Sequence, residues 1–466
     1  MSESTLQAKT QSAFRGRIGV ATVDITPPTG IYARNWGAAK HDVADWIHRR
    51  LTLNALVLSE SNSKQPLVFL DADLGWWRSL PTFRRFQSRL LEELELDEAS
   101  LIFGVSHTHA SPPLTDPDPD LPASASLAEY LETVYLAAVK VTRAAMKNST
   151  EAVLEWKTGC CGLASMRDLP DPDPEAERII CGWNPDEPAD DTLVVGRITD
   201  LEGALQAVIV NYACHPTTLA WENTAISPDY PGAMRDTIKE TLDVPALFMQ
   251  GASGELSPRY QYVGDVAVAD RHGRQLAYAV MATLEDMEPP GTCLKYSGVM
   301  ESGAPLAVWK HVVDKPGLKL KTLQTQVEIP LKDWPTADEL ETQRQACTDR
   351  ALEERLRRRR NIRRGIGDGK TLELPIWVWQ MGETILIGSP TEAYSILQRE
   401  LRRRYPERTI ACLNLINGTT GYLAPAELYD LDLYQVWQTP FERGGLEQVI
   451  EAMADAIGQI IETETV

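Results

Sequence analysis

Three histidines stand where they could bind a metal ion. His107 and His109 are two positions apart after one apolar run, and His215 follows another apolar run far along the chain. In extended backbone, residues two apart project to the same side, so the paired imidazoles can reach one centre. Zinc favours such nitrogen ligands, and Glu392 is placed to add a carboxylate. The pattern predicts a zinc site; the alternative is that each histidine is a polar residue satisfied locally.

Five apolar runs end abruptly in small, polar or metal-binding residues. The runs are 101–105, 207–210, 246–249, 384–388 and 412–415. In open α/β sheets, ligands bind beyond the carboxyl ends of the strands. We therefore expect these five junctions, far apart in sequence, to meet at one site.

Strand and helix patterns alternate along the chain. Runs rich in Val, Leu and Phe predict strands over 17–26, 51–60 and 66–74. Apolar residues at helical spacing predict helices over 82–96, 126–146, 265–287 and 445–462. This alternation indicates an α/β fold with mixed central sheets covered by helices and an active site at the strand C-terminal ends.

The domain organisation is expected to be one catalytic unit with an insertion. Residues 1–15 are predicted to be a disordered lead-in, and 16–290 with 371–466 to form the catalytic domain. Residues 291–370 hold few strand signals and one long charged helix over 336–364, which indicates a small inserted helical subdomain. The arginine run in 355–364 is interpreted as a solvated helix face with ion pairs, or alternatively as an anion-binding patch.

Composition excludes several classes of protein. The net charge of −20 repels the phosphates of nucleic acids and anionic lipids, so neither DNA nor RNA is an expected partner. A chain of 466 residues can bury a core without a structural metal, so a metal here is expected to be catalytic. The seven cysteines are expected to be reduced thiols. Neither a signal peptide nor a membrane span is recognisable, which predicts a cytoplasmic location.

Six segments, in order along the chain, resemble the neutral/alkaline (non-lysosomal) ceramidase family. They are Gly19–Pro28, Ser106–Pro112, Asn211–Thr217, Met249–Pro258, Ser389–Glu392 and Tyr422–Thr439. The chain is similar to the N-terminal catalytic domain of that family, as a short and divergent member. The resemblance implies that His107, His215, Glu392 and Tyr434 hold Zn²⁺.

The resemblance also implies roles around the metal. His109 would act on the substrate or on the developing oxyanion, and Arg167 would point into the same pocket. Ser257 matches a serine of the family's GDVSP segment and would be a nucleophile or a supporting residue. Asp73 and Asp229 could orient the ligating imidazoles, or they could instead serve as buried caps.

These residues together predict metal-assisted hydrolysis of an amide (N-acyl) bond. Zinc makes its bound water acidic near neutral pH, and His109 with Arg167 would stabilise the tetrahedral oxyanion. The expected partner is a small-molecule or lipid-like amide; the oligomeric state is not predicted. Two alternatives stay open: a zinc hydrolase of another small ester or amide, and an inactive relative that only binds a ligand.

Overall fold

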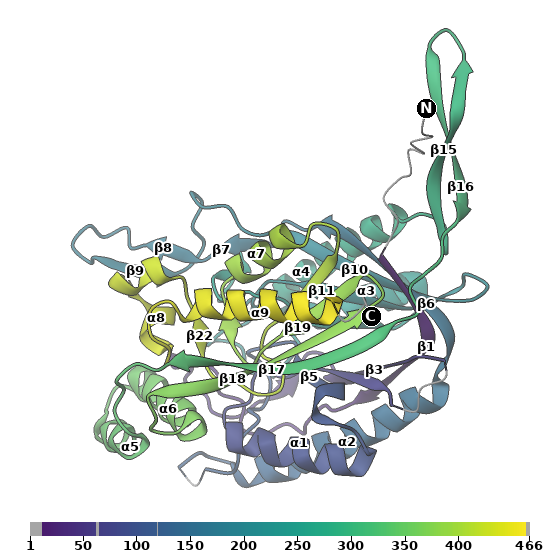
Figure 1. Ribbon diagram of the computed structural model, residues 1–466. Coiled ribbons are helices and arrows are strands. Elements are labelled where there is room, and N and C mark those ends of the chain that lie inside the picture. The colour runs from purple at the N-terminus through teal and green to yellow at the C-terminus, as the bar shows by residue number, and fades with distance from the viewer. Residues whose placement is uncertain (1–11, 62–64, 119, 463–466) are drawn as a thin grey trace.

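Two large β-sheets form the centre of the protein, and a computed structural model describes residues 12–61, 65–118 and 120–462 (Figure 1). The eight strands of the first sheet are, in spatial order, β13 (Ala246–Gln250), β11 (Leu205–Tyr212), β10 (Thr192–Asp200), β6 (Thr150–Cys160), β1 (Ser12–Asp24), β3 (Thr52–Ser59), β4 (Leu67–Ala72) and β5 (Leu101–Val105). The four strands of the second are β17 (Leu320–Pro330), β18 (Thr371–Met381), β19 (Thr384–Gly388) and β21 (Thr409–Leu413).

Both sheets mix parallel and antiparallel pairs, as predicted. Parallel pairing joins β13 to β11, β4 to β5 and β19 to β21, and the other neighbours are antiparallel. Parallel neighbours need a crossover, and helices supply it here. The carboxyl ends of the parallel strands therefore carry long connections, where functional residues can be placed.

The sheets pack face to face because their strands are apolar on both sides. In β19, Leu386 joins the core between the sheets, whereas Ile385 and Ile387 face the opposite way. In β11, Ile209 faces the same inter-sheet core and Val210 faces outward. Since neighbouring residues of a strand point to opposite faces, such strands need a covering layer on each side.

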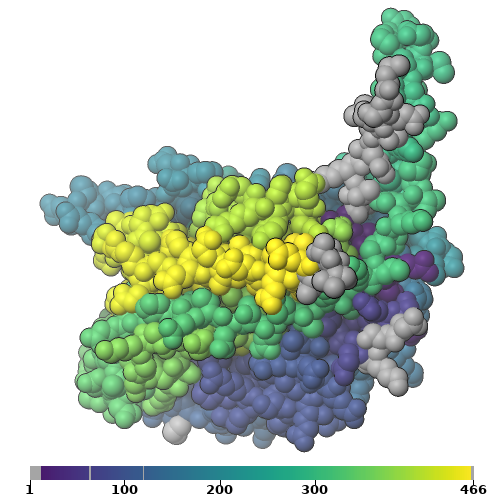
Figure 2. All heavy atoms as spheres, in the orientation of Figure 1, coloured from purple at the N-terminus to yellow at the C-terminus, as the bar shows by residue number. Residues whose placement is uncertain are grey.

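Helices supply the outer layers. The first sheet is covered by α1 (Leu80–Leu94) and α2 (Ala125–Asn148) beside β3 to β5, and by α3 (Tyr230–Leu242) and α4 (Val266–Glu285) beside β10 to β13. The second sheet is covered by α7 (Ile396–Arg404) and α9 (Gly445–Glu462). Figure 2 shows the C-terminal helices lying across the body of the molecule. The helices predicted over 82–96, 126–146, 265–287 and 445–462 form as α1, α2, α4 and α9, and the fold class is confirmed.

Short elements connect these layers. They are β2 (Trp46–Ile47), β7 (Ala164–Met166), β8 (Asp168–Pro170), β9 (Arg178–Cys181), β12 (Ala225–Ile226), β14 (Leu256–Pro258), β20 (Glu392–Ala393), β22 (Tyr422–Leu423), β23 (Asp432–Leu433), α8 (Tyr434–Gln438) and two 3₁₀ turns, η1 (Glu98–Ser100) and η2 (Ala426–Asp430). Several of them follow the long strands directly. Of the residues discussed below, Glu392 lies in β20, Tyr422 in β22 and Tyr434 in α8.

The segment 291–370 contains strands as well as helices. Its strands are β15 (Thr292–Glu301) and β16 (Pro305–Val313), which form a projecting arm (Figure 1), and β17, which pairs with β18 along its whole length. The expected long helix is two helices, α5 (Ala337–Ala346) and α6 (Arg350–Ile366). They separate because Cys347 is extended and the Asp349 side chain accepts hydrogen bonds from the first amides of α6. The division into a catalytic domain and an inserted subdomain stays a prediction.

Three further expectations concern chain ends, membranes and thiols. Of the predicted lead-in, residues 1–11 lie outside the described residues, and Ser12 to Arg15 belong to β1. Among the helices that the structure describes, none has the length and apolar character needed to cross a bilayer. The seven cysteines are free thiols.

Candidate metal centre

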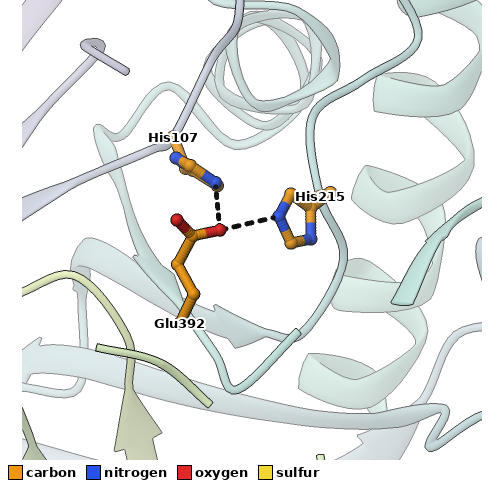
Figure 3. Close-up of side chains that lie close together, drawn as sticks. All are labelled: His107, His215 and Glu392. Carbon is orange, nitrogen blue, oxygen red and sulfur yellow. Dashed lines mark hydrogen bonds and ion pairs between the residues drawn. The ribbon is translucent and has the colours of Figure 1, made fainter. Parts of the chain in front are cut away.

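Three residues from three strand ends meet at one point. His107 follows β5, His215 follows β11, and Glu392 opens β20 just after β19. Figure 3 shows both imidazoles directed at one carboxylate oxygen. Oε2 of Glu392 lies 3.3 Å from Nε2 of His107 and 3.2 Å from Nε2 of His215. The ligand atoms of the three residues all lie within 4.8 Å of one another.

The Nδ1 hydrogen bonds of the two imidazoles leave the Nε2 atoms directed at Glu392, where a metal could bind. Nδ1 of His107 is 3.1 Å from the carbonyl oxygen of Gly75, and Nδ1 of His215 is 2.6 Å from that of Ser253. A carbonyl only accepts, so each Nδ1 carries the proton and each Nε2 presents a lone pair. Two lone pairs and a carboxylate oxygen then face one another, an arrangement that a cation stabilises. The donor set fits Zn²⁺.

Burial and charge keep the set in its ligating form. Burial, helped by the positive charge of Arg167, lowers the pKa of His215 to about 3, so this imidazole is neutral at neutral pH. Burial opposes ionisation of Glu392, but a proton held on the neighbouring His107 or His215 would keep the pKa of its carboxyl well below the ordinary value. A neutral imidazole and an ionised carboxylate are the states that bind a metal.

The backbone at His107 adopts an unusual conformation. Its φ is +67°, in the left-handed region that non-glycine residues seldom occupy. The following turn is fixed by Thr108, whose hydroxyl donates to the carbonyl of Ser227 at 2.7 Å and accepts from the amide of Ala110. Such conformations persist where the surrounding contacts impose them, often at functional sites. Here the turn directs the side chain of His107 toward Glu392.

His109 lies beside this centre between two indole rings. Its ring centroid is 5.0 Å from those of both Trp36 and Trp76, and 5.0 Å from that of His107. Among the described protein atoms, neither of its ring nitrogens has a hydrogen-bond partner. Burial, followed by the nearby His107 and His215, holds the pKa of His109 well below its ordinary value. A neutral imidazole with both nitrogens available can take up and release a proton.

Arg167 and Tyr422 complete the wall next to His215. Nη2 of Arg167 donates to the carbonyl of Gly254 at 2.5 Å and lies 3.4 Å from Nε2 of His215 and 3.5 Å from the Tyr422 hydroxyl. Tyr422 in turn hydrogen bonds to the Glu392 carboxylate. Sequence reasoning placed Arg167 at the site but gave Tyr422 no role of its own. The sequence did offer one indication of Tyr422: it closes the cluster of small and polar residues that follows the apolar run 412–415.

Tyr434, the first residue of α8, lines the same cavity as His107 and Glu392. Its ring centroid is 5.9 Å from that of Tyr422, and its hydroxyl accepts a hydrogen bond from Arg358 at 3.2 Å. The phenol oxygen is therefore polarised by a guanidinium. Whether it ligates a metal stays a prediction.

The remaining predicted residues lie away from the ligand atoms. Asp73 accepts hydrogen bonds from Thr52 and pairs with Arg235. Asp229 accepts from the amide of Tyr230 and so caps α3. The Nδ1 atoms of the two imidazoles contact backbone carbonyls, so these carbonyls, and not Asp73 or Asp229, orient the rings. Asp229 instead has the alternative role, that of a buried helix cap.

Ser257 is fully buried in β14, and its hydroxyl accepts a hydrogen bond from Gln261 at 2.7 Å. It contributes to neither of the two cavities that meet at His109. A nucleophile must reach the substrate carbonyl, so this position favours a supporting role. Its part in catalysis stays untested.

Two cavities meet at His109. One is lined by His107 and Glu392, with Trp77, Leu80 and Ile362 also in its walls. The other is larger and is lined by Arg167 and Tyr262. Both are lined by His109, Glu354, Arg358, Tyr422 and Tyr434. The two cavities therefore share a wall beside the candidate metal centre.

The arginine run of α6 is not a solvated face. Arg357, Arg360 and Arg363 are buried and form ion pairs with Asp118, Glu341 and Asp368 respectively. The expected ion pairs are present, but one partner, Asp118, comes from a segment far away in sequence. Arg358 lines both cavities, which sequence reasoning missed because nothing in a run of arginines distinguishes the residue that faces a site.

Comparisons with known proteins agree on the fold. No protein-family model matches the sequence, and no curated protein matches it either. Among solved structures, "Ceramidase complexed with C2" is similar with a TM-score of 0.67, at 15% identity, covering 96% of this chain and 75% of that one. The neutral ceramidase from Pseudomonas aeruginosa has a TM-score of 0.66, at 17% identity, covering 96% and 74%. The predicted likeness to neutral ceramidase is confirmed at the level of the fold.

Proposed function

We propose that this chain is a zinc-dependent hydrolase that cleaves an amide (N-acyl) bond with water, as neutral ceramidases do. The observation that carries the proposal is the convergence of two imidazole lone pairs and one carboxylate, from His107, His215 and Glu392, at the strand ends of this fold. The likeness to ceramidase structures supports an amide as the substrate.

A zinc ion at this site would supply the chemistry common to zinc hydrolases. Bound Zn²⁺ would polarise a carbonyl oxygen and make water acidic near neutral pH. His107, His215 and Glu392 would hold it, and Tyr434 is the candidate for a further ligand. Gly75 and Ser253 fix the imidazoles through their carbonyls, which sets the protonated nitrogen and the ring orientation.

The remaining steps belong to the protein's own side chains. His109, neutral at neutral pH, would accept a proton from the attacking water and pass it to the leaving amine. Arg167, with its guanidinium 3.4 Å from His215, would offer positive charge to the oxygen that becomes anionic. Trp36 and Trp76 enclose His109 and limit access of bulk water.

The test measures metal and hydrolysis in the same preparations. The full chain should bind one zinc per molecule, and chelation should abolish hydrolysis of short-chain N-acyl compounds until zinc is restored. His107→Ala should lose both properties. His311 provides a matched histidine control. It is exposed on the projecting arm and pairs with Glu288, so His311→Ala should leave the candidate metal centre unchanged.

Two other outcomes would identify the alternatives. Turnover of small esters but not amides, with zinc still required, would identify a different zinc hydrolase. Zinc-independent ligand binding without turnover of any substrate would identify an inactive relative. A chain that neither retains zinc nor responds to chelation would contradict the proposal.

A further inference from the structure

The larger cavity carries positive charge although the protein as a whole is strongly acidic. Four arginines line it, Arg167, Arg178, Arg355 and Arg358, against two acids, Glu354 and Asp432. The net charge of the whole chain is −20. A positive wall in so acidic a molecule attracts anions selectively, because a cavity with low-dielectric walls focuses the field of its charges.

Most arginines at the two cavities already have acidic partners. Arg358 pairs with Glu354 at 3.1 Å, Arg178 with Asp171 at 2.7 Å, and Arg357 with Asp118 at 2.6 Å. Arg355 and Arg167 differ, since no carboxylate within the described part of the chain forms an ion pair with either; Arg167 instead donates to the carbonyl of Gly254. Arg355 is also exposed, so an incoming ligand can reach it.

The side chain of Arg355 is held by aromatic rings rather than by acids. Its guanidinium carbon is 5.2 Å from the ring centroid of Tyr434 and 5.1 Å from that of Trp437. An arginine stacked on aromatic faces keeps its N–H edge free for bidentate hydrogen bonds to a carboxylate. Tyr434 also lines the cavity that contains His107 and Glu392, so Arg355 stacks on a wall of that cavity.

We propose that the substrate carries a carboxylate, as an N-acyl amino acid does, and that Arg355 binds it. The inference rests on the proposed function. The acyl chain would occupy the smaller cavity with Trp77, Leu80 and Ile362, and the amino-acid part would extend into the larger one toward Arg355. Water adds to the amide carbonyl, the C–N bond breaks, and a proton passes to the amine, so the products are a fatty acid and an amino acid.

The experiment compares two substrates that differ only in charge. N-Octanoylglycine bears a carboxylate, and N-octanoylglycinamide is its neutral counterpart; release of octanoate is measured for both with the zinc-loaded full chain. We expect kcat/KM for the acid to exceed that for the amide by at least tenfold. Arg355→Gln should reduce this ratio about tenfold or more, mainly through KM, and Arg355→Lys should restore part of it.

The ratio of kcat/KM for the acid to that for the amide distinguishes carboxylate binding by Arg355 from a purely structural role of this side chain. If Arg355 only supports Tyr434, the substitution slows both substrates alike and the ratio stays constant, which overturns the inference. Arg364, exposed on the same helix and outside both cavities, is the matched control, and Arg364→Gln should leave the ratio unchanged.

Calorimetric binding of the same two compounds gives an answer that does not depend on turnover. Tighter binding of the acid, lost in Arg355→Gln, supports the inference even if neither compound is cleaved, in which case only the proposed hydrolysis fails. Equal turnover of acid and amide contradicts the inference and leaves the proposed function standing. Absence of binding by both compounds also contradicts it.

Discussion

Nε2 of His215 lies 3.2 Å from Oε2 of Glu392, although the two residues follow strands of different sheets. His215 comes after β11 of the eight-stranded sheet, and Glu392 comes after β19 of the four-stranded sheet. The contact exists only when the two sheets are packed correctly. The candidate metal centre therefore depends on the tertiary fold.

Glu392→Gln should weaken zinc binding strongly. The amide cannot supply negative charge, and its NH₂ group faces the lone pairs of His107 and His215 if the oxygen does not. We expect at least a hundredfold loss of zinc affinity with a matching loss of activity. Zinc content by mass spectrometry checks this, and a variant that retains wild-type zinc content would exclude Glu392 from the ligand set.

His109→Asn should separate chemistry from metal binding. A proton-transferring imidazole typically contributes about 10²–10⁴-fold to a rate, and asparagine cannot transfer a proton in this way. Zinc content should remain at the wild-type value, because His109 is not part of the three-residue cluster. Single-turnover rates provide the measurement, and an unchanged rate would remove His109 from the mechanism.

Ser257→Ala should retain zinc and most of the activity. The Ser257 hydroxyl accepts from Gln261 and contributes to neither cavity, so its loss costs one buried hydrogen bond, about 1 kcal/mol of stability. Hydrolysis within a few-fold of wild type is expected. If activity disappears while zinc remains bound, a serine nucleophile is the better description.

Removal of the metal should destabilise the fold. A ligand that binds only the folded state stabilises it by mass action, by about 4 kcal/mol when its free concentration is about a thousand times Kd. Thermal unfolding of the zinc-loaded chain and of the chelated chain should therefore differ in midpoint by several degrees. In His107→Ala the two midpoints should coincide, and coincident midpoints in the wild type would argue against a bound metal.

Stability should fall as pH rises through the range in which Glu255 ionises. Burial raises the pKa of this carboxyl from 4.5 to about 7, although hydrogen bonds from Ser395 oppose the shift. The folded state keeps the proton while the unfolded state loses it, so the contribution of Glu255 to stability is greatest below pH 4.5 and declines by about 3 kcal/mol as pH approaches 7. Urea unfolding of Glu255→Gln should lack this part of the pH dependence; an identical slope in both proteins would contradict the assignment.

The sequence predicted many of the buried strands because they are almost entirely apolar, but β6, β10, β17 and β18 were not among the predicted strands. β5, β11, β13 and β19 stand out as short apolar runs, and each covering helix has its apolar residues on one face. β15 and β16 were missed for the opposite reason. Their large apolar side chains, such as Met300 and Trp309, are exposed. Because neither strand buries one face in a core, the sequence does not show the alternation of apolar and polar residues that predicts a strand.

The candidate site was predicted in part. HxH spacing and strand-end position suffice to suggest His107, His215 and Glu392, because each of these residues closely follows an apolar run that is visible in the sequence. Arg355 and Arg358 were not distinguishable, since their place depends on how α6 packs against Trp76, Tyr434 and Trp437 from remote segments. The orienting groups of the imidazoles were also missed, because backbone carbonyls leave no trace in residue identity.

The projecting arm enters and leaves the body of the protein at a single place. Thr292 and Val313 are cross-strand partners at its base, and Asp314 is hydrogen bonded back to Gly291. A short turn could join these positions without redirecting the chain on either side. The arm is thus a modular appendage, which evolution or a protein engineer can lengthen, exchange or excise while the body of the protein keeps its architecture.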